Sequence, residues 1–181
     1  STEEDAERAL EELKEELRRV EKENRDSLKR IREKLKEVED EHRKTLEELK
    51  KELDDVMRKI KDERKKRKVE KLRRELEKAK RDSEKLLRDL ERKIDEVEKT
   101  SKKMLEELER DLRKILDDVR KAKLDKDSLK RLLDEARKKL EELKRRLEKL
   151  DRDLDESLKR LKEDLDRLDR ELRRLLDELD K

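Results

Sequence analysis

Apolar residues recur along the first third of the chain at alternating steps of four and three residues. The pattern repeats every 18 residues, which corresponds to five turns of an α-helix with about 3.6 residues per turn. No glycine, proline or polar cluster interrupts it, so the spacing predicts one helix over residues 2–60. This first stripe consists of Ala6, Leu10, Leu13, Leu17, Val20, Asn24, Leu28, Ile31, Leu35, Val38, His42, Leu46, Leu49, Leu53, Val56 and Ile60.

Two further stripes follow and predict helices over residues 63–124 and 128–180. In an antiparallel pair, residues at one level along the axis have numbers with a constant sum. That sum is 125 for the first and second stripes and 255 for the second and third, so the chain should reverse near residues 62 and 127. The second stripe is Val69, Leu72, Leu76, Ala79, Ser83, Leu87, Leu90, Ile94, Val97, Ser101, Leu105, Leu108, Leu112, Ile115 and Val119, and the third is Leu132, Ala136, Leu140, Leu143, Leu147, Leu150, Leu154, Leu158, Leu161, Leu165, Leu168, Leu172, Leu176 and Leu179.

The three stripes predict an all-α fold, an antiparallel up-down-up three-helix bundle in a single domain over residues 1–181. Each helix should be about 58 residues long at this spacing. A repeat of seven residues imposes a left-handed supercoil and a repeat of eleven a right-handed one. The repeat of 18 residues requires neither, so we expect nearly straight helices.

Aspartates at the two predicted reversals can begin the helices that follow. Asp62 precedes the second helix, and Asp125 and Asp127 compete as the cap of the third. An aspartate side chain at this position accepts hydrogen bonds from the first free backbone N–H groups. With Asp125 as the cap, Leu124 and Leu129 would form a hydrophobic staple. The chain contains no glycine, which helices often use at their C-terminal ends, so the turns must form without it.

Polar residues interrupt the apolar stripes at two levels. The register places one layer on all three helices and a second layer one repeat away. We expect these layers to be buried hydrogen-bond networks that fix the helix register, because a slipped helix would leave several polar groups unpaired. The first layer contains Asn24, Ser27, Ser101 and Ser157, and the second contains His42, Thr45 and Ser83.

The only histidine in the chain, His42, lies on the first stripe and is expected to be a satisfied core residue. A metal site would need further ligands, and no Cys, His or inward carboxylate is expected beside it. With Ser83 it could suggest a nucleophile and base, but the stripes supply no acid to orient the ring and no cleft. The run of basic residues 64–68 lacks aromatic neighbours and is expected to be a solvated helix start.

The composition excludes several classes of protein. Charged residues make up 66% of the chain and nearly cancel to a net charge of +3, which is too little for a nucleic-acid footprint. The absence of cysteine excludes disulfides. No apolar run approaches a membrane span, and no signal-peptide core is present, so we expect a soluble protein. No cofactor and no metal is expected.

Strict 18-residue blocks, a core of Leu, Ile and Val, a surface of Glu, Lys, Arg and Asp, and buried polar layers resemble a de novo designed, parametrically generated helical bundle of the untwisted antiparallel three-helix type. This resemblance implies a very stable scaffold without a natural substrate, cofactor, partner or cellular location. It also implies thermal unfolding above about 90 °C. The turns without glycine depart from common design practice.

Two alternatives come from other classes. The chain could be a natural coiled-coil interaction module resembling spectrin-type repeats, although those carry aromatic core residues and this chain has none. It could also be a single charged helix acting as a spacer, although such helices lack apolar stripes. Enzymatic activity is not expected. A monomer is expected, and exchange of helices between chains would give an oligomer.

Overall fold

The computed structural model describes residues 2–179, and this part of the chain consists of three α-helices without a β-strand. Helix α1 spans Thr2–Lys59, α2 spans Glu63–Arg120 and α3 spans Lys126–Leu179. The predicted all-α three-helix bundle is confirmed. Helix α2 ends four residues before the predicted residue 124, and α3 begins two residues before the predicted residue 128. The predicted end of the third helix, Asp180, lies outside the described residues.

Helix α2 ends early because the backbone turns into the left-handed region at Ala122, where φ is 53°. The N–H of Ala122 donates to the carbonyl of Val119, and the N–H of Lys123 donates to the carbonyl of Asp118, both at 3.1 Å. These two bonds form a Schellman motif, which satisfies carbonyls that would otherwise be free at the helix end. An alanine therefore occupies the position that glycine usually takes.

Replacing Ala122 by glycine is expected to raise the free energy of unfolding by about 1 kcal/mol, because only the Cβ atom makes the left-handed conformation costly. Chemical denaturation followed by circular dichroism measures the change. Ala79, which is buried inside α2, is the control, because glycine there should destabilise the helix. Equal losses at both positions would contradict the strain at Ala122.

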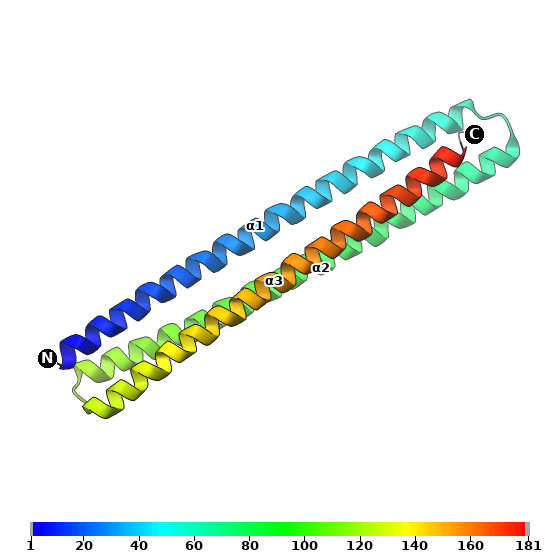
Figure 1. Ribbon diagram of the computed structural model, residues 1–181. Helices are drawn as coiled ribbons and strands as arrows, with labels where there is room; N and C mark the ends of the chain where they lie inside the picture. The colour runs from blue at the N-terminus through cyan, green and yellow to red at the C-terminus, as the bar shows by residue number, and fades with distance from the viewer. Residues whose placement is uncertain (1, 180–181) are drawn as a thin grey trace. The chain divides into compact units, whose positions relative to one another are not determined.

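The single domain over residues 1–181 stays a prediction, and the structure divides into two compact units. Each unit takes a segment from all three helices. The first unit combines Ser1–Arg30 with Ile94–Leu154, and the second combines Ile31–Lys93 with Asp155–Lys181. Within each unit α2 runs opposite to α1 and α3, as the colours of Figure 1 show.

The core of the first unit is built from the predicted stripe positions of all three helices. Leu10, Leu112 and Leu140 are among its most deeply buried side chains. At the start of α3 the buried leucines are Leu129 and Leu133, while the predicted stripe residue Leu132 is only partly buried. The buried positions Leu129, Leu133, Ala136 and Leu140 are separated by four, three and four residues, which keeps them on one helical face. Each fully buried leucine contributes about 1.5–3 kcal/mol of transfer free energy.

The core of the second unit also joins all three helices. Leu53 of α1, Val69 of α2 and Leu176 of α3 are almost completely buried in it. A charged single-helix spacer has no such core, so that alternative is wrong for this chain. The helices pack against one another because each presents one continuous apolar face, which the 18-residue spacing provides.

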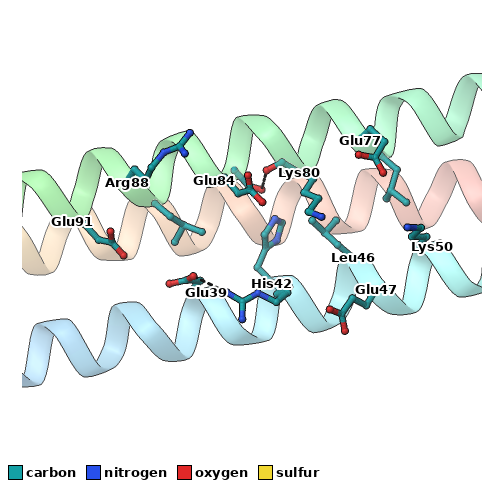
Figure 2. Close-up of a pocket in the computed structure, with 14 residues that line it drawn as sticks. Glu39, His42, Leu46, Glu47, Lys50, Glu77, Lys80, Glu84, Arg88 and Glu91 are labelled. Carbon is teal, nitrogen blue, oxygen red and sulfur yellow. Dashed lines mark hydrogen bonds and ion pairs between the residues drawn. The ribbon is translucent and has the colours of Figure 1, made fainter.

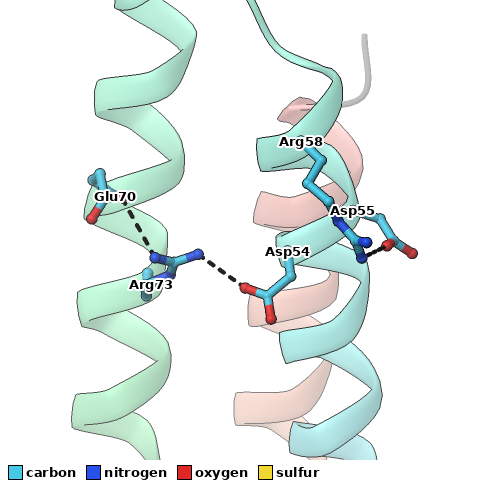
Figure 3. Close-up of polar contacts among 5 residues, drawn as sticks. All are labelled: Asp54, Asp55, Arg58, Glu70 and Arg73. Atoms are coloured by element: carbon cyan, nitrogen blue, oxygen red, sulfur yellow. Dashed lines mark hydrogen bonds and ion pairs between the residues drawn. The ribbon is translucent and has the colours of Figure 1, made fainter.

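Charged pairs join the helices at the borders of the second unit's core. Arg73 of α2 lies 2.9 Å from Asp54 of α1 and 3.6 Å from Glu70, and Asp55 pairs with Arg58 within α1 (Figure 3). Arg73 and Asp54 are both substantially exposed, so such a pair contributes at most about 1 kcal/mol. These pairs help to select which helices lie side by side, but they add little to the stability of the fold.

The first unit carries two comparable pairs on α3. Lys139 donates a hydrogen bond to Asp111 of α2 at 3.0 Å, and Lys144 donates to Glu16 of α1. These hydrogen bonds raise the pKa of both lysines above the usual value. The resulting stabilisation is present below the ordinary lysine pKa and is lost as the pH rises through the raised value. It is therefore in place at neutral pH.

Candidate functional site

His42 is the most unusual buried residue of the second unit. Its side chain is 4% exposed, and its Nδ1 atom lies 3.0 Å from Oδ1 and 3.3 Å from Oδ2 of Asp169 on α3. A carboxylate can only accept a hydrogen bond, so Nδ1 carries the hydrogen in this pair. The sequence predicts no acid beside His42, and that prediction is wrong.

The other nitrogen of the His42 ring, Nε2, is buried and has no hydrogen-bond partner among the described residues. His42 reaches from α1 toward α2 and lines a groove of about 530 Å³ between these two helices (Figure 2). The apolar part of the groove wall is formed by Leu46, Leu76 and Leu87, and Ser83 also lines the groove. The sequence predicts a packed seam without a cleft at this level, and the groove corrects that prediction.

The hydroxyl groups near His42 bond within their own helices. Ser83 donates to the carbonyl of Lys80 at 3.0 Å, and Thr45 donates to the carbonyl of Glu41 at 3.0 Å. Both bonds satisfy the hydroxyl with a carbonyl three or four residues earlier, a pattern common in helices. Ser83 and His42 thus share the level that the register predicts without forming the hydrogen bond that a nucleophile and its base require.

The predicted layer of the first unit is also incomplete. Asn24 and Ser101 are buried, but Oδ1 of Asn24 and Oγ of Ser101 have no hydrogen-bond partner among the described residues. Ser27 is half-buried. Ser157 belongs to the second unit, where it accepts a hydrogen bond of 2.7 Å from Lys93. Asn24 and Ser101 are buried, whereas Ser27 and Ser157 are only partly buried, and the role of the layer in fixing the register stays a prediction. The register does not determine how far each hydroxyl or amide reaches.

The helix caps follow from backbone hydrogen bonds. The side chain of Asp62 accepts a bond of 3.0 Å from the N–H of Arg64, and that of Asp125 accepts one of 2.7 Å from the N–H of Ser128. Asp127 lies inside the first turn of α3 and does not occupy the cap position. Leu124 is partly buried and Leu129 is buried in one core, as a hydrophobic staple requires.

Asp125 caps α3 best in its ionised form. The hydrogen bonds from the backbone and side chain of Ser128 hold the pKa of Asp125 below the usual value. A lowered pKa contributes stability above the ordinary aspartate pKa, and this contribution is lost as the pH falls through the lowered value. The start of α3 is therefore best held at neutral pH.

Replacing Asp125 by asparagine is expected to leave stability almost unchanged at pH 7, because both residues cap helices well. Below about pH 4, where free aspartate takes up a proton, the wild-type chain should become less stable than the variant, because only the wild-type cap is lost on protonation. Thermal melts of both proteins from pH 7 to pH 2 measure this. Asp127→Asn serves as the matched control. A pH dependence that is identical in the Asp125 variant and the wild type would contradict the capping role.

Neither a metal cluster nor a membrane span emerges from the described part of the chain. It holds no group of three or more His, Cys, Asp or Glu side chains able to bind a metal ion together. None of the described helices is apolar over enough length to cross a membrane. The ionisable pair of the candidate site joins the buried His42 to the partly buried Asp169.

Sequence reasoning missed Asp169 because only residues on the stripes were considered. The register contained a usable signal. The sums of 125 and 255 place Leu172 level with His42, and Asp169 is one helical turn before Leu172 on α3. A search for polar residues one turn above and below each polar stripe position would have identified the pair.

Comparison with known proteins gives the chain a family. A model of the LXG domain of the WXG superfamily matches residues 63–181, about two thirds of the sequence. The chain belongs to the LXG family. The LXG match begins at the first residue of α2 and includes the whole of α3. No curated protein and no solved structure matches the chain.

Membership of the LXG family corrects the resemblance to a designed bundle. The predictions of a de novo origin and of a designed scaffold without natural function are wrong, because a natural family accounts for most of the sequence. The regular stripe misled for a physical reason. Any three long helices that share a core must repeat their apolar positions at the helical period. Regular spacing therefore reports how the helices pack and not how the sequence arose.

Proposed function

We propose that this chain is a natural helical module that acts by protein–protein interaction, without catalysis, in a protein connected with type VII secretion. The observation that carries the proposal is the LXG match over residues 63–181, since the WXG superfamily is related to type VII secretion. Of the functions predicted from the sequence, the natural helical interaction module is the one that this match supports.

The physical properties of the described residues support a binding role. Each unit has its own leucine-rich core, so the outer helix faces are free to contact a partner. Helices recognise other helices through such faces. Basic and acidic residues number 61 and 58, so the balanced surface favours a protein partner over a nucleic acid. We propose that one chain is the functional unit, because the helices of one chain supply both cores.

The groove at His42 does not favour an enzyme. A base activates a nucleophile through a hydrogen bond of about 2.6–3.2 Å. The hydroxyl of Ser83 donates instead to its own helix, and Nε2 of His42 has no partner among the described residues. The proposal therefore assigns no reaction to this pair.

Secretion tests the proposed function directly. The chain, fused to a reporter, is produced in a bacterium with a working type VII secretion system and in the same strain without it. We expect the fusion in the culture medium of the first strain only. An unrelated three-helix protein of similar length, fused to the same reporter, controls for leakage. Equal retention of the chain in both strains, or equal release from both, would overturn the proposal.

A further inference from the structure

The groove between α1 and α2 of the second unit owes its existence to two residues. Most neighbouring levels of the two stripes carry leucines, whereas this level carries His42 and Ser83. Ser83 is small, and its hydroxyl turns back to the carbonyl of Lys80. Ser83 thus leaves space that a leucine would fill, and His42 on the facing helix supplies the buried imidazole that lines this space (Figure 2).

The hydrogen bonding of His42 determines which chemical group it can recognise. Asp169 accepts the hydrogen of Nδ1, so Nε2 presents a lone pair and accepts hydrogen bonds. Nε2 is buried, and no described protein atom donates to it. Because protein atoms cover Nε2, a ligand in the groove must displace this cover and supply an O–H or N–H donor to bond with it.

The other residues that line the groove determine the polarity of the molecule that can fill it. Leu46, Leu76 and Leu87 supply apolar surface, and five glutamates and four Lys or Arg residues give the lining a formal charge of only −1. Some of these charges neutralise each other, since Arg43 donates to Glu39 at 2.8 Å. A neutral, mainly apolar molecule fits this wall better than an ion does.

The size of the groove distinguishes a small molecule from a partner helix. Its volume of about 530 Å³ lies within the range of about 300–1,000 Å³ that is usual for small-molecule sites. Two turns of a helix about 11 Å in diameter and about 11 Å long occupy roughly 1,000 Å³. The groove can therefore enclose a small molecule but not a helical segment of this length.

We propose that this groove binds a small, neutral, mainly apolar molecule with one hydroxyl donor, of the phenol class, and that Nε2 of His42 accepts its hydrogen bond. Asp169 acts as a positioning residue that keeps the hydrogen on Nδ1. This inference goes beyond the proposed function and does not depend on it, because it rests only on residues of the second unit.

Titration of the full chain with p-cresol, followed by NMR of the imidazole, tests the proposal. His42 is the only histidine, so its ring signals are unambiguous. We expect a saturable shift of the Nε2 resonance. Toluene has the same ring without the hydroxyl, and it should bind at least about tenfold more weakly, which corresponds to a hydrogen bond of about 1.4 kcal/mol. No saturable shift with p-cresol, or equal affinity for toluene, would overturn the proposal.

Variants locate the ligand. Ser83→Leu should fill the groove and weaken p-cresol binding at least about tenfold, while the matched variant Ser157→Leu in the same unit should bind like the wild type. Asp169→Asn can donate to Nδ1 and shift the hydrogen to Nε2, so p-cresol should lose its advantage over toluene. Circular dichroism checks that each variant is folded. Full binding by a folded Ser83→Leu variant would place the ligand elsewhere and overturn the proposal, and the toluene comparison decides the matter if this variant does not fold.

Discussion

Replacing Leu112 by alanine is expected to lower the free energy of unfolding by about 2–5 kcal/mol. Leu112 is 1% exposed and lies in the core of the first unit, where side chains of all three helices meet. Alanine loses the transfer free energy of the removed carbons and leaves a cavity that the rigid helices can close only in part. Urea denaturation followed by circular dichroism measures the loss.

Leu86→Ala is the matched control for this prediction. Leu86 lies on the same helix but is 43% exposed, so the same substitution should change stability by no more than about 0.5 kcal/mol. A similar loss in both variants would mean that Leu112 does not belong to a close-packed core.

Replacing Asn24 by leucine together with Ser101 by alanine is expected to raise the free energy of unfolding by about 2–4 kcal/mol. A buried polar group without a partner costs about 1–3 kcal/mol. Oδ1 of Asn24 and Oγ of Ser101 are two such atoms among the described residues. Each apolar replacement removes this cost, and leucine adds buried apolar surface. Denaturation in guanidinium chloride measures the gain.

Thr45→Val is the control, since the Thr45 hydroxyl already donates to the carbonyl of Glu41 and the residue is partly exposed. We expect a change within about 0.5 kcal/mol. A loss of stability in the Asn24 and Ser101 double variant would show that the two polar groups are satisfied in solution. If they also fix the helix register, the more stable variant should give broader amide NMR signals than the wild type.

Hydrophobic spacing predicted the helices well because nearly every helical turn places a side chain in the core. The stripes identify Leu10, Leu53 and Leu154 as core residues, and all three are almost completely buried. A long helix must repeat its apolar face at the helical period. The same signal therefore recurs many times along the sequence, and a single polar residue in the stripe does not hide it. Helix ends were predicted less well, because they depend on one or two local bonds.

The two turns illustrate this difference. Asp62 and Asp125 are identifiable as cap residues from their type and position, and both accept backbone hydrogen bonds. The end of α2 is not identifiable in this way, because Ala122 carries no signal for a left-handed conformation. It adopts that conformation because the chain must reverse there and no glycine is present.

The sequence by itself determined the number of helices, their antiparallel order and most of the buried leucines, because these depend on a repeated apolar face. Only the tertiary structure determined the partners of the buried polar residues. His42 pairs with Asp169 on another helix, Ser83 bonds to its own helix, and a groove lies between α1 and α2. Side-chain reach and rotamer in three dimensions set these contacts, and a one-dimensional register does not contain them.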